Sequence, residues 1–272
     1  MDSIVLASSE CDPSSEIICA PTTITELFEF RTPLFEILGF PVTKTVVLIF
    51  LAALLGVLFL WLGLRKRSVV PGKGQLITET VVGFVRNDIA VGIIGPEGVR
   101  YFPYLLALFV FILIGNAFEV IPGISFPITS RVALPLFLAL LTWVIFIAAG
   151  LKRQGWGYLK GIVWPASVPI ALRWFVGIIE FVSTIFLRPL TLAIRLFANL
   201  VAGHLMLTLL LVSGWIFMSN IGNIGPKALI GLAWFVIGLG IYLFEVVVIL
   251  LQAYIFTLLS AVYIQTSLYP EH

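Results

Sequence analysis

Long apolar stretches without charge dominate this 272-residue chain and restrict what it can fold into. Three of them, 46–64, 103–118 and 132–151, contain no Asp, Glu, Lys or Arg. A helix of about 20 apolar residues crosses the ~30 Å hydrocarbon core of a bilayer. These stretches therefore predict membrane-spanning helices, and the chain is predicted to be an all-α polytopic membrane protein.

Composition supports this class and excludes several others. The chain is 60% hydrophobic and 11% charged, whereas soluble domains are about 25% charged. A net charge of +2 is too small to predict a nucleic-acid partner. The sequence has no Gly-rich phosphate loop, so no cofactor is predicted. His204 and His272 are the only histidines, which excludes a multi-histidine metal site.

Two further apolar segments are too long for one perpendicular crossing. Residues 171–213 have no clear break except Pro189 and would extend about 64 Å as a helix. Either a helical hairpin broken near Pro189 or one strongly tilted helix fits this length. A Gly/Asn-rich turn from Gly214 to Pro226 then leads to a second long segment, 227–267, antiparallel to the first. The sequence thus predicts about five membrane-embedded helices.

Basic residues set the predicted orientation. Arg65-Lys66-Arg67 and Lys152-Arg153 follow the first and third spans, and the positive-inside rule places them in the cytoplasm. The N-terminus is then outside and the C-terminus inside. Residues 75–94 are amphipathic and predict a helix on the cytoplasmic surface.

We expect residues 1–41 to be an extramembrane segment and 42–272 to form a single transmembrane domain. The first 40 residues lack the pattern of a cleaved signal peptide. Cys11 and Cys19 lie in this segment, and either a disulfide or two free thiols is consistent with the sequence.

Arg195 lies in the apolar part of the first long segment, where a permanent cation costs about 2.5–3.5 kcal/mol at the bilayer centre. On a helical projection it shares a face with Arg188, Thr191 and Asn199. Glu180 lies about 60° from that face on the same projection. These residues would form a polar lane toward the cytoplasm.

Further polar residues lie away from the helix face that carries Arg195. His204 lies roughly opposite Arg195 and closer to the outside. On the last segment, Glu245 and Gln252 share one face, with Glu245 at the depth of Arg195 and Gln252 about two turns deeper. Asn116 and Glu119 lie at the end of the second span and are predicted near the outer membrane surface.

Each of these polar residues has a structural interpretation as well. A single intramembrane histidine or amide often bonds a neighbouring helix, and Glu180 with Arg188 fits a structural ion pair. Together they favour an ion path, because His has a pKa near 6.5 and buried carboxyls titrate near neutrality. Arginine does not release its proton, so Arg195 would act as a barrier between two half-paths.

The motifs also resemble a known family. RPLTLAIRLFANLVAGH is similar to the signature helix of subunit a of the rotary F-type ATP synthase. FILIGNAFEVIPG before it and LFEVVVILLQAYIFTLLSAVYI after it resemble the same subunit in order and spacing. The resemblance covers 46–272 and leaves out the first 40 residues. It favours the long tilted helices over the broken hairpin.

The resemblance implies a role for each polar residue. Arg195 would be the essential charge that faces the carboxylate of each passing c-subunit. A proton-uptake half-channel would contain Asn116, Glu119, Asn199, His204, Glu245 and Gln252. A proton-release half-channel would contain Glu180, Arg188 and Thr191. Some relatives have glutamate first and histidine second in the uptake pair, whereas here the order is His204 and then Glu245.

The implied protein is a stator subunit that couples proton flow to c-ring rotation and ATP synthesis. It has no catalytic chemistry, metal or cofactor of its own. Its implied partners are the c-ring, the b-type subunits of the peripheral stalk, other ATP synthase subunits and the lipid bilayer. The alternatives are a self-contained secondary transporter or ion channel, for which the halves show no internal repeat, and a structural scaffold.

Some properties stay open at this level. The coupling ion, proton or sodium, depends on the binding site of the ring, and the ring size is not encoded in this chain. The role of 1–41 is open. Bacterial-type motifs favour a bacterial plasma membrane, with an organelle-encoded copy as the alternative.

Overall fold

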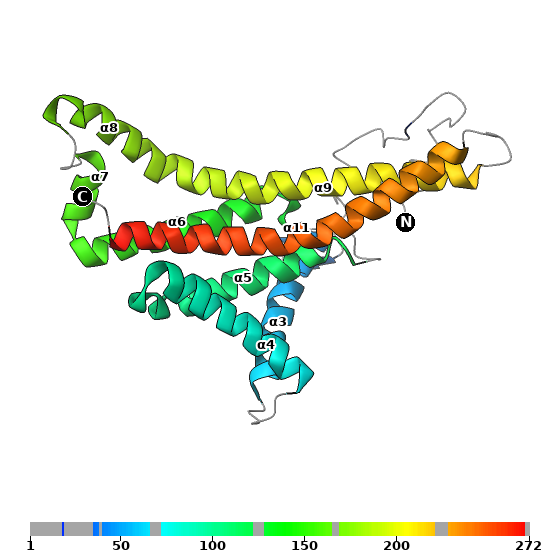
Figure 1. Cartoon of the computed structure of the whole chain (residues 1–272), viewed down its shortest axis with the longest axis horizontal. Coiled ribbons are helices and arrows are strands. Elements are labelled where there is room, and N and C mark those ends of the chain that lie inside the picture. The colour runs from blue at the N-terminus through cyan, green and yellow to red at the C-terminus, as the bar shows by residue number, and fades with distance from the viewer. Residues whose placement is uncertain are drawn as a thin grey trace. The chain divides into compact units, whose positions relative to one another are not determined.

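The computed structural model describes residues 18, 35–37, 40–65, 72–121, 128–164, 169–220 and 228–269 (Figure 1). Cys11 and Cys19 lie outside these residues, so their pairing stays an open prediction. Contacts group the described residues into two compact units, which we describe separately. Unit 1 consists of the described parts of Met1–Phe50, Gly115–Ser130 and Ala198–Leu250, and unit 2 of those of Leu51–Ile114, Arg131–Phe197 and Leu251–His272.

The described residues are almost entirely helical. The α-helices are α3 (Lys44–Arg65), α4 (Lys73–Phe84), α5 (Phe102–Ala117), α6 (Ala133–Gln154), α7 (Trp156–Val163), α8 (Ile170–Val182), α9 (Arg188–Ser219) and α11 (Ala228–Leu268). The π-helical segments are η1 (Val85–Ile94) and η4 (Ser183–Leu187), and the 3₁₀ segments are η2 (Pro96–Arg100) and η3 (Ile128–Ser130). A small antiparallel hairpin, β1 (Phe35–Ile37) and β2 (Phe40–Val42), precedes α3.

The predicted fold class, an all-α polytopic membrane protein, is confirmed. Among the described residues, four continuous helices are long and apolar enough to cross a bilayer: Lys44–Arg65, Ala133–Gln154, Leu172–Ser219 and Leu229–Leu268. The predicted span at 103–118 is the shorter apolar helix α5. The 41 residues of α11 extend about 60 Å. That is about twice the hydrocarbon thickness, so α11 must tilt strongly to stay in the bilayer.

The amphipathic segment predicted at 75–94 becomes α4 followed by η1. Phe84, at the end of α4, packs with ring centroids 6.1 Å from Phe109 of α5 and 5.7 Å from Tyr254 of α11. Val85 and Ile89 are fully buried in the core of unit 2. The polar residues Arg86, Asn87 and Asp88 between them are exposed. The apolar side of this segment is therefore a part of the protein core.

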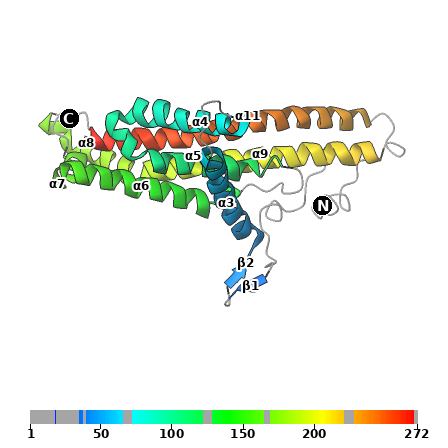
Figure 2. The same ribbon diagram turned by 90° about the horizontal axis from the view of Figure 1, so that it is seen from below.

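In unit 1, α9 and α11 run side by side in both views, as the yellow and orange ribbons of Figures 1 and 2 show. Glycines allow this close approach. A Cβ added at Gly231 would lie 2.5 Å from Cβ of Phe217, and one at Gly214 would lie 2.9 Å from the backbone nitrogen of Phe235. Small residues at helix interfaces are typical of membrane proteins. Gly214 is thus a packing residue, and α9 continues to Ser219, beyond the predicted end at 213.

The long first segment is one continuous helix through Pro189, as the family resemblance favoured, and the alternative hairpin broken near Pro189 is not formed. Proline lacks an N–H and crowds the carbonyl four residues before it. The π turn η4 lies just before it, and there the Arg188 N–H donates to the Ser183 carbonyl. The next carbonyl in this pattern, that of Thr184, faces the missing N–H of Pro189. It accepts instead a hydrogen bond from the indole Nε1 of Trp143, at 3.2 Å.

The Trp143 hydrogen bond gives a testable prediction for stability. Trp143→Phe leaves the buried Thr184 carbonyl without its donor, which costs about 1–3 kcal/mol. We expect a lower midpoint of thermal unfolding for the purified full chain in detergent. Trp156→Phe is the matched control, because Trp156 is 84% exposed, and it should leave the midpoint unchanged. Equal midpoints for the two variants would contradict the role of Trp143.

Candidate functional site

Four polar side chains are buried together in the elements of unit 1. Asn116 ends α5, Glu119 lies in the turn after it, His204 lies in α9 and Glu245 in α11. Their exposed fractions are 0%, 5%, 9% and 3%, respectively. Charged residues are almost never fully buried unless they are paired. This concentration of ionisable groups is therefore a candidate functional site.

Glu119 and His204 face each other across this site. Glu119 Oε1 lies 3.8 Å from His204 Nδ1, too far for a direct hydrogen bond but close enough for charge attraction. Within the described ranges, neither carboxyl oxygen of Glu119 has a hydrogen-bond partner, and neither does Oε1 of Glu245. Buried polar atoms without partners are rare in native proteins, and three of them here belong to two carboxyl groups. The site thus combines two carboxyl groups and one imidazole, groups that chemically can bind and release protons.

Asn116 is oriented by a residue that the sequence did not indicate. The Thr129 hydroxyl donates to Asn116 Oδ1 at 2.8 Å, and both residues are fully buried. The amide oxygen is thus engaged, whereas Nδ2 of Asn116 has no hydrogen-bond partner within the described ranges. Thr129 lies in η3 between Ile128 and Ser130, where its sequence context carries no functional signal.

Gly203 provides the space for the Glu245 carboxyl group. A Cβ at position 203 would lie 2.5 Å from Glu245 Oε2 and 2.6 Å from its Cδ. One turn before Glu245, the Tyr242 hydroxyl donates to the Val120 carbonyl at 2.8 Å. This bond ties the turn that carries Glu119 to α11. Neither Gly203 nor Tyr242 was singled out by the sequence.

In unit 2, Arg195 and Thr191 are exposed on α9, and Gln252 is buried on α11. The Thr191 hydroxyl donates to backbone carbonyls of its own helix, at 2.7 Å from that of Leu187. In the part of the chain that the structure describes, Arg195 makes no hydrogen bond or ion pair. Asn199, the next residue on the predicted face, is exposed and belongs to unit 1.

Arg188 differs from its predicted neighbours on that face because it turns toward α11. Its Nη1 donates to Thr266 Oγ1 at 3.5 Å, and its guanidinium lies 5.5 Å from the centroid of the Tyr263 ring. Arg188 is half-buried, whereas Thr191 and Arg195 are exposed. The structure therefore separates Arg188 from the exposed row that contains Arg195.

A second polar cluster of unit 2 surrounds Tyr158 of α7, a helix that the sequence did not predict. Tyr158 is buried and its hydroxyl is 2.9 Å from Ser267 Oγ. Burial raises the pKa of Tyr158, the hydrogen bond with Ser267 and the positive charge of Arg188 lower it, and Glu180 raises it. Glu180 and Arg188 are thus both close enough to Tyr158 to act on it. Gly150 makes room for the ring, since a Cβ there would lie 2.7 Å from it.

These features define a class of protein. Ionisable side chains inside membrane helices are costly and mark ion or proton paths. Among the described residues, no group of three or more His, Cys, Asp or Glu side chains is placed to hold a metal ion. The fold is that of a helical membrane protein, and its buried ionisable groups are of the kind that mark ion paths.

Comparison with known proteins identifies the family. The family model of the ATP synthase A chain matches residues 45–265. ATP synthase subunit a of Frankia alni is 43% identical over 231 residues, which cover 84% of this chain and 78% of the relative. ATP synthase subunit a of Nocardioides sp. is 40% identical over 85% of this chain and 83% of its own length. The chain belongs to the ATP synthase A chain family, the proton-channel subunit of the F-type ATP synthase, which confirms the predicted resemblance.

Two glycine substitutions test whether Gly203 provides the space that the Glu245 carboxyl group needs. Gly203→Ala forces this flexible carboxyl group to move while the backbone stays in place. We expect normal membrane insertion but a loss of ATP-driven proton pumping on the order of 10- to 100-fold, the effect of a misplacement of about 1 Å. Gly240→Ala is the control, because a Cβ there meets nothing within 4 Å. Pumping by Gly203→Ala equal to that of the control would refute the assignment.

The role of Thr129 can be tested with an isosteric pair. Thr129→Val keeps the shape but removes the donor to Asn116, and an unsatisfied buried amide costs about 1–3 kcal/mol. We expect a lower thermal midpoint and reduced pumping in inverted membrane vesicles. Thr129→Ser retains the hydroxyl and should restore both. If the valine variant matches the wild type in both measurements, Thr129 does not position Asn116.

Proposed function

We propose that this chain forms two offset proton half-channels and exchanges protons with the carboxylates of a rotating c-ring. The observation that carries this proposal is the buried group in unit 1, where Glu119 Oε1 lies 3.8 Å from His204 Nδ1. A structural ion pair would close this gap with direct hydrogen bonds. Acid and imidazole groups that lie this close to each other inside a membrane protein are suited to pass protons on.

The proposed uptake half-channel contains Asn116, Glu119, His204 and Glu245 of unit 1. The family resemblance adds Asn199 and Gln252 to it. Imidazole and carboxyl groups both change protonation state near neutral pH when they are buried. A proton from outside would pass along them and reach a ring carboxylate. The reversed order of histidine and glutamate keeps one acid and one base on facing helices, so the relay chemistry is retained.

The proposed contact surface for the ring is the exposed face of α9. Thr191 and Ile194 precede Arg195 on this face, and all three residues are exposed. Their spacing of three and four residues follows one side of a helix. Small and apolar residues around one cation suit a neighbouring helix that carries a single carboxylate. Arg195 would stabilise the ionised form of that carboxylate and so lower its pKa.

The proposed release half-channel lies in unit 2 and contains Glu180, Arg188 and Thr191. Its support is the cluster in which Glu180 and Arg188 both act on the pKa of Tyr158. A carboxylate deprotonated beside Arg195 would pass its proton along this lane. Arg195 keeps its own proton, so a proton moves between the two half-channels only on the ring. A membrane potential supplies about 2.3 kcal/mol per charge per 100 mV.

The basic residues also support an orientation. Arg65 ends α3, and Lys152 and Arg153 lie in the last turn of α6. The positive-inside rule then places the N-terminus outside and the C-terminus in the cytoplasm. The named relatives are bacterial, which supports a bacterial plasma membrane. The proposed partners are the c-ring, the b-type subunits of the peripheral stalk and the other ATP synthase subunits.

The barrier role of Arg195 is tested by its removal. We expect Arg195→Ala to abolish ATP-driven proton pumping in inverted vesicles that contain the assembled complex. Removal of the permanent charge takes away the group that ionises the ring carboxylate. Arg100→Gln, a change at an exposed arginine of η2, should leave pumping unchanged.

Two outcomes would overturn this proposal. Pumping that persists in Arg195→Ala would exclude the barrier role. Proton transport by the purified chain in vesicles without a c-ring would favour the self-contained transporter or channel.

A further inference from the structure

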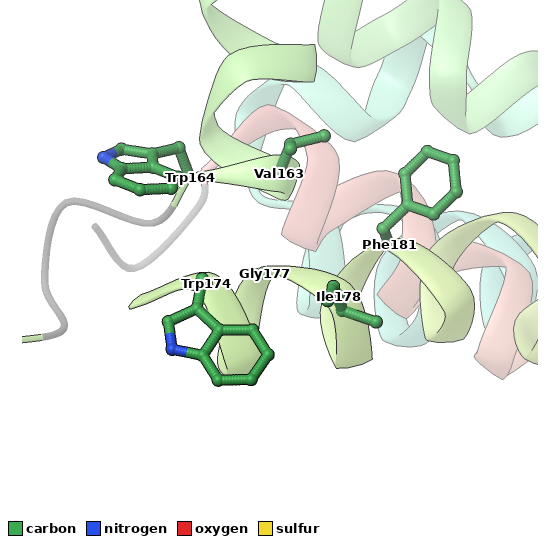
Figure 3. A pocket seen from close by; sticks show the side chains of 6 residues that line it. All are labelled: Val163, Trp164, Trp174, Gly177, Ile178 and Phe181. Carbon is green, nitrogen blue, oxygen red and sulfur yellow. The ribbon is translucent and has the colours of Figure 1, made fainter. Parts of the chain in front are cut away.

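A hollow between α7 and α8 in unit 2 has a different chemistry from the proposed half-channels. Its volume is about 340 Å³. Figure 3 shows the two walls, with Val163 and Trp164 on one side and Trp174, Ile178 and Phe181 on the other, beside Gly177. Every lining side chain is apolar or aromatic. Ligand sites of this size are concave and mostly apolar, so the hollow is suited to a hydrocarbon group.

The position of the hollow in the helices indicates the depth of the ligand. The continuous apolar helix begins at Leu172, directly before Arg173 and Trp174. Tryptophan is enriched where membrane helices meet the headgroup region, and the hollow has one on each wall. The lining of the hollow thus begins at the headgroup level with Trp174. It continues along α8 toward the hydrocarbon with Ile178 and Phe181. An acyl chain that descends from a headgroup would follow the same direction.

Basic residues at the rim indicate the charge of the ligand. The Arg173 guanidinium lies 5.8 Å from the centroid of the Trp164 ring and so stands at the edge of the hollow. Lys160, one turn before Val163 on α7, is exposed. A cation beside an apolar groove complements a phosphate above an acyl chain, and anionic lipids bind basic residues at the membrane surface.

We propose that this hollow binds one acyl chain of an anionic phospholipid, with its phosphate beside Arg173. The proposal depends on the membrane location of the chain and not on the half-channels. A bound lipid here would cover the exposed aromatic side chains of α8, such as Trp174, which is 59% exposed. It would also connect α7 to α8, the helix that carries Glu180.

Tryptophan quenching by brominated lipids tests this site in the full chain reconstituted in vesicles. Phosphatidylcholine vesicles would contain equal mole fractions of chain-brominated phosphatidylglycerol or chain-brominated phosphatidylcholine. The difference in fluorescence between wild type and Trp174→Phe isolates the signal of Trp174. We expect the anionic lipid to quench this signal about fivefold more effectively, the preference that one basic residue near an anionic surface provides.

Variants at the rim show whether the preference belongs to this hollow. Arg173→Gln should make the two lipids equivalent, and Arg173→Lys should restore the preference. Arg65→Gln is the matched control, because Arg65 lies 4.7 Å from the Trp61 ring at the end of α3 but does not line the hollow. It should keep the full preference of the wild type.

Three results would overturn the proposal. Equal quenching by the two lipids in wild type would exclude charge selection, and a preference that survives in Arg173→Gln would place it elsewhere. The measurement is repeated in the assembled ATP synthase, where a loss of quenching would show that protein and not lipid covers the hollow. None of these outcomes bears on Arg195, so the two proposals succeed or fail separately.

Discussion

Hydrocarbon offers no hydrogen bonds, and this constraint shapes every part of the chain that lies in the membrane. Each backbone group in a span must find its partner within the protein. Regular helices meet this need almost everywhere, and the exception at Pro189 shows how strictly it applies. There the π turn and the indole of Trp143 supply the hydrogen bonding that proline removes. The same constraint requires polar side chains to face protein or an aqueous path, so the rare buried acids are informative.

The two groups of polar residues are built in different ways. In unit 1, Glu119 lies 3.8 Å from His204, and neutral residues border the site, with Thr129 bonded to Asn116 and Gly203 against the Glu245 carboxyl group. In unit 2 the polar residues are bonded to each other or to the backbone, as with Arg188 and Thr266, while Arg195 stays exposed. The contacts of Arg188 hold one cation of unit 2 against α11, whereas Gly203 and Thr129 shape the space around the acid and amide groups of unit 1.

Much of the fold was predictable because hydropathy alone fixes where a chain enters and leaves lipid. The boundaries of α3, α5 and α11 lie within two residues of those predicted. The identity of the buried acids was also readable, since Glu119 and Glu245 interrupt apolar runs. The residues that pack around the polar sites could not be predicted from the sequence. Thr129, Gly203 and Tyr158 have common side chains in ordinary contexts, and their importance arises only from helix packing. The turn of Arg188 toward α11 depends on contacts of its long side chain with Thr266 and Tyr263, which a projection of one helix does not include.

The π turn before Pro189 has a consequence for the angular phase of the helix. On a regular α-helix the 15 positions from Glu180 to Arg195 would set these residues about 60° apart. A π turn accommodates one extra residue, so the angle corresponds to 14 positions and becomes about 40° in the opposite sense. The insertion therefore rotates Glu180 by about 100° around the axis while Arg195 keeps its place. The extra residue of the π turn thus changes the direction in which Glu180 points from the helix axis. The side chain itself stays the same.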